Sequence, residues 1–104
     1  MKRNRPASKQ TLRVLAVLLS RPSRWYHGYE LSKETQLKSG TLYPILMRLC
    51  DRDFLEAKWE NKIRSNRPPR HLYRLTQSGK NFAKEQLRKT VSLNKSRVLT
   101  EVHP

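Results

Sequence analysis

The sequence has little of what extracellular, membrane-spanning and metal-binding proteins need. Its single cysteine, Cys50, cannot form an internal disulfide, so a reducing, cytoplasmic setting is expected. The longest apolar run, Val14 to Leu19, is too short to cross a bilayer, and no membrane contact is expected. With only one cysteine, the scattered histidines make no zinc-ligand pattern; they are His27, His71 and His103.

Acidic residues are also scarce, at 8 against 23 Lys and Arg, which gives a net charge of +15 and a pI near 10.8. Residues 1–24 carry seven basic residues and no acid, and residues 61–76 carry five and no acid. A surface that is merely solvated normally mixes both signs. We therefore expect these two blocks to face a polyanion. Counterion release from the polyanion would strengthen this binding.

Hydrophobic residues make up only 36% of the 104 residues. Such a chain forms one domain, with either disordered ends or a core completed by a second copy. No nucleophile–base set stands out, and three scattered glycines make no phosphate-cradling loop. We predict neither an enzyme, nor a cofactor, nor a bound metal.

The first helix is predicted over 9–20, with Ser8 as its N-cap. One predicted face consists of Leu12, Leu15, Ala16 and Leu19. Further apolar residues widen the buried surface beyond one face, so part of it is expected to meet a partner subunit; they are Val14, Val17 and Leu18.

A second, shorter helix is predicted over 26–35, with Leu31 and Tyr29 facing inward, followed by a turn at 36–38. A third helix should begin at Gly40 or Thr41 and end near Asp51. Its expected core stripe follows helical spacing and consists of Leu42, Ile45, Leu46 and Leu49. Pro44 is expected in the first turn, where its missing N–H costs little.

Alternating patterns predict strands over 54–60 and 71–75, joined by a basic loop that contains Pro68 and Pro69. Thr76 should cap a last helix that packs through Phe82, Ala83 and Leu87. Beyond residue 90 the chain has weak helix formers, so helix there would need tertiary support. The predicted fold is α+β and mostly helical: a winged helix-turn-helix of three helices and a two-stranded wing, followed by a C-terminal helix.

Three blocks carry a family resemblance: 27–31 (HGYEL), 39–49 (SGTLYPILMRL) and 67–79, from RPPR through YRLT to Gly79. In this order and spacing they resemble the PadR family of transcriptional regulators over about residues 10–85. The resemblance implies a homodimer that binds operator DNA, often as a repressor, with a C-terminal helix that mediates dimerisation. Three departures stand out. Gln77-Ser78 replaces a frequent acidic residue, Asn66 replaces a wing glycine, and the short C-terminal segment resembles the compact branch.

Candidate DNA contacts fall in three groups. The recognition helix and the turn before it contribute Lys38, Ser39, Thr41, Tyr43, Met47 and Arg48. The wing contributes Lys62, Arg64, Asn66, Arg67 and Arg70, and the arm contributes Lys2, Arg3 and Arg5. Two alternatives stay open: Tyr43 could pack on the wing, and Arg48 could pair with Asp51.

The expected dimerisation residues come from the first and last helices: Leu12, Leu15, Leu19, Phe82, Leu87 and Val91. Trp25 and Trp59 are predicted to be core or interface residues rather than the walls of a pocket for an aromatic effector. Cys50 is predicted to be a small buried side chain.

These patterns divide the chain into a basic arm (1–8), a DNA-binding domain (9–76) and a C-terminal helix with a frayed tail (77–104). The predicted function is sequence-specific binding of double-stranded DNA by a homodimer that regulates transcription, as a repressor. Two alternatives remain: a winged-helix adaptor for a protein partner, and a non-specific nucleic-acid binder driven by charge. Nothing in the sequence itself supports a small aromatic effector.

Overall fold

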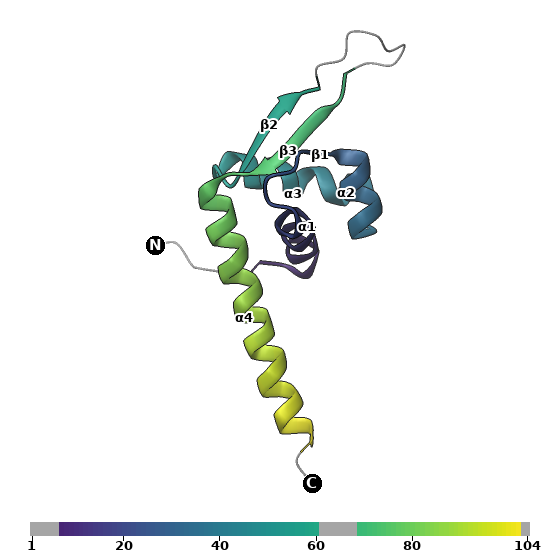
Figure 1. Ribbon diagram of the computed structural model, residues 1–104. Helices are drawn as coiled ribbons and strands as arrows, with labels where there is room; N and C mark the ends of the chain where they lie inside the picture. Colours follow the sequence, from purple (N-terminus) through teal and green to yellow (C-terminus); the bar gives the residue numbers. More distant parts are fainter. Residues whose placement is uncertain (1–6, 61–68, 103–104) are drawn as a thin grey trace.

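The computed structural model describes residues 7–60 and 69–102, and the side chains of 91–102 are outside this description. Its helices are α1 (Lys9–Ser20), α2 (Gly28–Thr35), α3 (Ser39–Asp51) and α4 (Gln77–Val102). Its strands are β1 (Tyr26–His27), β2 (Leu55–Trp59) and β3 (His71–Leu75). Figure 1 shows α1, α2 and α3 gathered in one body, with the β2–β3 hairpin leaving it on one side and α4 on the other. The predicted α+β, mostly helical winged-helix architecture is confirmed.

Helix α1 has the predicted bounds and the predicted cap, since Ser8 Oγ accepts a hydrogen bond from the Thr11 amide at 3.1 Å. Its buried face was predicted correctly at Leu15 and wrongly at Ala16. The buried residues are Val14, Leu15 and Leu18, whereas Ala16 is exposed. Because apolar side chains lie on most sides of this helix, its periodicity alone does not determine the inner face. Packing against the neighbouring elements determines it.

The core lies where α1, α2 and α3 meet the inner face of the sheet. Helix α3 contributes the predicted stripe of Leu42, Ile45, Leu46 and Leu49, each at most 3% exposed. Leu31, Tyr26, Leu55 and Leu75 close the core from the other elements.

The prediction of a single helix over 26–35 was wrong. Tyr26 pairs with Tyr73 and His27 with Leu72, so β1 joins the hairpin and the sheet has the order β1-β3-β2. The predicted two-stranded wing is therefore part of a three-stranded antiparallel sheet. Helix α2 starts only at Gly28, because Glu30 Oε1 accepts a hydrogen bond from the His27 amide at 3.1 Å and caps the helix there.

The turn between α2 and α3 is held by the buried Thr35 side chain. Its Oγ1 donates to the Leu31 carbonyl at 2.6 Å and accepts from the Leu37 amide at 3.3 Å. Gln36 adopts the left-handed conformation with φ of 60°. The chain therefore reverses within three residues, which sets α3 against α2.

Helix α3 begins at Ser39, one residue earlier than expected, and this moves Pro44 into the second turn. The prediction that Pro44 lies in the first turn was wrong. A proline there removes the hydrogen bond to the carbonyl of Gly40, four residues earlier. Gly40 is exposed, so water can reach that carbonyl and the helix continues to Asp51.

The hairpin matches its prediction closely: β3 has the expected bounds, and β2 is one residue shorter at each end. Thr76 caps α4 as predicted, because its Oγ1 accepts from the Gly79 amide at 2.9 Å. The same hydroxyl donates to the Asp53 carbonyl at 2.6 Å. Phe54 and Phe82 stack with ring centroids 4.2 Å apart, so the start of α4 is fixed to the strand side of the body.

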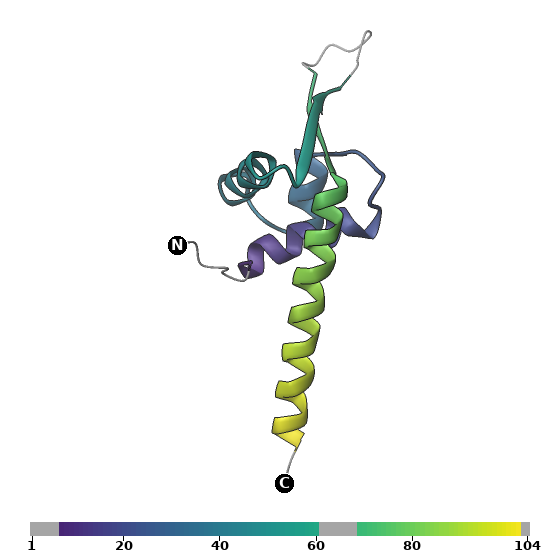
Figure 2. The same ribbon diagram turned by 90° about the vertical axis from the view of Figure 1, so that its left-hand side faces the viewer.

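Beyond this junction α4 packs against α1 and then continues away from the body in both views (Figures 1 and 2). The helix runs to Val102, through the weak helix formers after residue 90.

Two glycines provide a matched test of this packing. A Cβ at Gly79 would lie 1.9 Å from the carbonyl oxygen of Phe54, whereas one at Gly40 would meet nothing within 4 Å. We expect Gly79→Ala to lower the free energy of unfolding by about 1–3 kcal/mol or more. Gly40→Ala is expected to be neutral, or to stabilise by up to about 1 kcal/mol, because alanine is the better helix former. Urea unfolding at one fixed protein concentration measures both, and equal losses would contradict the close approach at Gly79.

Candidate nucleic-acid interface

Helix α3 presents a continuous exposed ridge on the side away from the core. Helical spacing places Gly40, Pro44, Met47 and Asp51 opposite the buried stripe, and all four are exposed. Met47 is 64% exposed although it is apolar. Arg48 and Thr41 flank the ridge on one side, and Tyr43 flanks it on the other.

All six candidate residues of this region lie on the exposed surface: Lys38, Ser39, Thr41, Tyr43, Met47 and Arg48. Lys38 is the N-cap residue of α3. The first backbone N–H groups of a helix favour an anion, and Lys38, Ser39 and Thr41 are exposed near this helix start.

Tyr43 is partly packed and 41% exposed. Its hydroxyl fills the space beside Gly28, where an added Cβ would lie 2.0 Å from the Tyr43 oxygen. A pocket of about 280 Å³ at this place is also lined by Tyr29, Arg70 and Tyr73. The alternative that Tyr43 packs beside the wing is thus met in part, while the rest of the ring remains accessible.

Tyr73 also lines this pocket and is 7% exposed. Burial, and then the nearby Tyr43 and Cys50, raise the pKa of Tyr73. The phenol is therefore protonated at neutral pH and can donate a hydrogen bond. Cys50 is half-buried against the core, and burial likewise raises the pKa of its thiol, which disfavours the reactive thiolate.

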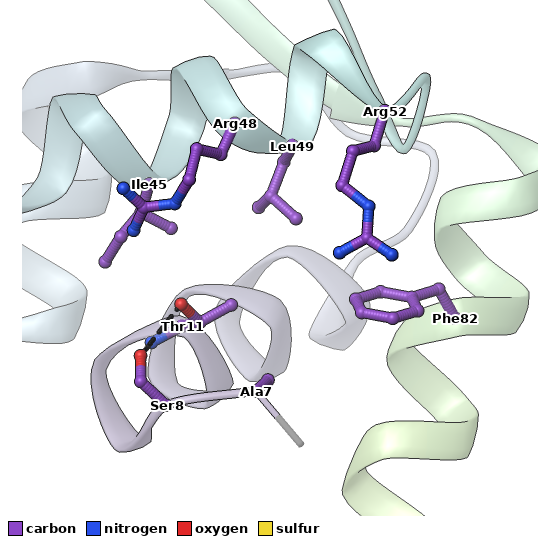
Figure 3. Close-up of a pocket in the computed structure, with 8 residues that line it drawn as sticks. All are labelled: Ala7, Ser8, Thr11, Ile45, Arg48, Leu49, Arg52 and Phe82. Carbon is purple, nitrogen blue, oxygen red and sulfur yellow. Dashed lines mark hydrogen bonds between the residues drawn. The ribbon is translucent and has the colours of Figure 1, made fainter. Parts of the chain in front are cut away.

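Arg48 does not form the alternative ion pair with Asp51. Among the side chains that the structure describes, no contact joins Arg48 to Asp51. The Arg48 guanidinium is exposed and lies over the start of α1 (Figure 3). It can therefore approach a polyanion without first giving up a carboxylate.

The wing is described only in part. Lys62, Arg64, Asn66 and Arg67 lie outside the described residues, as do Lys2, Arg3 and Arg5 of the arm. Arg70 is described and half-buried, with its Nε 3.5 Å from Glu60 Oε1. It reaches the same pocket as Tyr43, which connects the wing to the recognition helix.

Two tryptophans, each predicted to be a core or interface residue, lie at the end of β2 and just before β1. Trp59 is 63% exposed, so it is not a core residue of this chain; its ring lies tilted against the ring of His71, with the ring centroids 3.8 Å apart. Trp25 is half-buried, with Lys58 Nζ 4.4 Å and the Arg74 guanidinium 4.3 Å from its ring. Strand alternation gave no sign of this exposure, because the strands extend beyond the core and both faces meet solvent there.

Tyr29 was also expected to face inward, but it is 63% exposed. It lies in the first turn of α2, with Lys33 Nζ 5.6 Å from its ring. The short helix, once shortened by β1, turns this ring outward on the side of Tyr43 and Arg70. Tyr29 is thus a surface residue near the ridge, although helical periodicity predicts it in the core.

Glu30 holds this end of α2 in place. Its carboxylate pairs with Arg24 and accepts from the His27 amide, and the His27 imidazole lies beside it without hydrogen-bond geometry. Partial burial would raise the pKa of Glu30, but the hydrogen bonds from Arg24 and His27 outweigh it, so the pKa is lowered. The ionised carboxylate therefore stabilises the cap.

The expected dimerisation residues differ in how much surface they leave. Leu12, Leu19, Phe82 and Leu87 are half-buried within the chain and keep an accessible part. Leu15 is 0% exposed, so it packs the core of its own chain and has no surface for a partner. The Val91 side chain lies outside the described residues.

No group of three or more His, Cys, Asp or Glu side chains that could hold a metal occurs in the described part of the chain. No helix there is long and apolar enough to cross a membrane.

Comparison with known proteins gives a direct result. The model of the transcriptional regulator PadR-like family matches residues 14–85, more than half of the chain. The chain belongs to the PadR-like family of transcriptional regulators. Its coarse function follows: it is a DNA-binding regulator of transcription, from a family whose members are not enzymes. No curated protein matches the sequence.

Solved structures share the fold. A PadR family regulator from Eggerthella lenta is 28% identical, with 86% of this chain and 82% of that chain covered and a TM-score of 0.67. One from Clostridium difficile R20291 is 22% identical, with 89% and 98% covered and a TM-score of 0.76. The PcaV regulator from Streptomyces coelicolor, solved with its natural ligand, is 19% identical, with 91% and 63% covered and a TM-score of 0.72. At these low identities the last two show the fold alone.

The Glu30 cap gives this PadR-like protein a defined pH response. A carboxyl group with a lowered pKa stabilises the fold above its unfolded-state value of about 4.3, and this contribution is lost as pH falls through the folded-state pKa. We expect Glu30→Gln to lower the Tm at pH 7, and the gap to the parent protein to close below about pH 4. The control is Glu34→Gln, which makes the same change at an exposed residue of the same helix. An unchanging gap between Glu30→Gln and the parent down to pH 3 would contradict the ionic cap.

Proposed function

We propose that this PadR-like protein represses transcription as a homodimer that binds a near-palindromic operator in double-stranded DNA. The observation that carries the proposal is the exposed ridge of α3, whose opposite face is locked in the core. Its role would be in the cytoplasm, where the DNA lies.

The ridge has the shape and chemistry for the major groove. Its apex is narrow, because Gly40 has no side chain and Pro44 is compact, so the helix backbone can come close to base edges. Met47 can contact a thymine methyl group, and Arg48 can reach a guanine edge or a phosphate. Tyr43, on the opposite flank, is placed for a phosphate oxygen.

The charge of the chain supports a duplex partner. The net charge of +15 provides sequence-independent affinity that falls with salt. On α3 the only acidic residue is Asp51, in its last turn. The turn before α3 and the flank of the ridge are basic through Lys38 and Arg48, so the approach to phosphates meets little repulsion.

The dimer is proposed from the surfaces that one chain leaves incomplete. Accessible apolar area remains at four half-buried residues: Leu12 and Leu19 on α1, and Phe82 and Leu87 on α4. Helix α4 is the helix that leaves the body in Figure 1. A two-fold dimer through these helices would present two α3 helices. Half-sites would then lie about 34–36 Å apart, one turn of DNA, which is why the operator should be nearly palindromic.

The experiment is selection of bound fragments from the source genome, followed by sequencing and by competition with unrelated duplex. We expect a near-palindromic site, two chains per site by sedimentation, and a preference of about a thousandfold or more over unrelated DNA. Equal affinity for all duplexes would overturn sequence-specific regulation and favour a charge-driven binder. No duplex binding in dilute buffer would overturn the function itself.

A single substitution tests the ridge. Arg48→Ala is expected to weaken binding to the selected operator about tenfold and to reduce the slope of log K against log salt by about 1. The control is Arg88→Ala on α4, which removes the same charge from an exposed residue paired with Glu85. Fluorescence anisotropy between about 50 and 200 mM salt measures both. Equal changes in the two variants would mean that only total charge matters.

A further inference from the structure

A second pocket lies on the other flank of α3. It has a volume of about 420 Å³ and opens between the start of α1, the C-terminal half of α3 and the first turns of α4 (Figure 3). Leu49 and Ile45 form its apolar wall. Arg48 and Arg52 line it as well, one helical turn apart on the same side of α3.

The two arginines bring positive charge that the described side chains do not neutralise. Among these, no carboxylate pairs with Arg48 or Arg52. The guanidinium of Arg52 lies 4.9 Å from the Phe54 ring and 5.3 Å from the Phe82 ring. Aromatic rings contact the face of a guanidinium, which leaves the N–H groups at its edge for an acceptor.

A hydroxyl donor lies across the pocket from Arg48. Ser8 Oγ accepts from the Thr11 amide and donates to Thr11 Oγ1 at 2.9 Å. Because the Thr11 oxygen accepts this bond, its own hydrogen is left to donate to a further acceptor. In Figure 3 this oxygen points from α1 toward α3, below the guanidinium of Arg48.

We propose that this pocket binds a phosphate group. A phosphate monoester carries about two negative charges and a phosphodiester carries one, and the oxygens of either can accept hydrogen bonds from a guanidinium and from Thr11. In Figure 3 the guanidinium of Arg48 lies beside Ile45 and that of Arg52 lies above Phe82, so contact with both requires these exposed side chains to turn toward the phosphate.

Two sources can supply the phosphate. One is the DNA backbone beside the groove that α3 occupies, and this source rests on the proposed function. The other is a small phosphorylated molecule, which would draw Arg48 away from the ridge and so weaken operator binding. Both follow from the same geometry, because Arg48 belongs to the pocket and flanks the ridge.

The first measurement uses the full chain without DNA. Phenyl phosphate and inorganic phosphate are titrated at constant ionic strength, and the Nε–Hε signals of Arg48 and Arg52 are followed by ¹H–¹⁵N NMR. We expect saturable shifts at both arginines. Arg52→Met should weaken binding at least tenfold, and Arg52→Lys should be intermediate, because lysine keeps the charge but loses the planar fork.

The matched control is Arg21→Met. Arg21 is exposed at the other end of α1, about 20 Å along the helix from Ser8, and its loss removes the same charge. Because Arg52 also contacts two rings, far-UV circular dichroism and urea unfolding check that Arg52→Met is folded. If it is not, Thr11→Val provides the same test from α1.

The second measurement uses the selected operator. If the DNA backbone supplies the phosphate, Arg52→Met lowers operator affinity and reduces the slope of log K against log salt by about 1. Both effects should be larger than those of Arg21→Met. If a small molecule supplies it, phenyl phosphate binds the parent and weakens operator binding, and Arg52→Met relieves that inhibition. The proposal is overturned if Arg52→Met behaves like Arg21→Met in both titrations. Failure of the proposed function would differ, since the parent itself would then lack operator preference.

Discussion

The buried stripe of α3 is the contact on which the rest of the molecule depends. Leu42 and Leu46 are 0% exposed, and Ile45 and Leu49 are 3% exposed, so the helix cannot rotate without opening the core. This fixed rotation determines which residues form the outer ridge. The exposed ridge and the stability of the fold therefore depend on the same helix, through its opposite faces.

The sequence was most informative where one helix face or one hydrogen bond determines the structure. The stripe of α3 and the caps at Ser8 and Thr76 could be predicted because each depends on neighbours in sequence. Strand β1 could not, since two residues form a strand only when β3 supplies the pairing. The inner face of α1 could be predicted only in part, for a related reason. Apolar side chains lie on most sides of this helix, so packing against α2 and α4 decides which of them are buried.

The candidate surface was predictable in type but not in detail. Charge and helical position located the exposed residues of α3. The packing of Tyr43 against Gly28, and the pocket that Arg48 shares with Ser8 and Phe82, depend on residues far apart in the chain. The exposure of Trp59 depends on where the core ends under the sheet, and no local pattern encodes that boundary.

The junction at the start of α4 connects the recognition helix to the helix that leaves the body. Thr76 is bonded to the Asp53 carbonyl just after α3, and Gly79 lies against the Phe54 carbonyl. Farther along α4, the buried Gln86 accepts a hydrogen bond from the Ala7 amide at 3.2 Å, which ties the start of α1 to the same helix. The direction of α4 relative to α3 is thus set within one chain. If two chains associate through α4, the spacing of their two ridges is inherited from this junction, so a change there would alter operator spacing without touching a DNA contact.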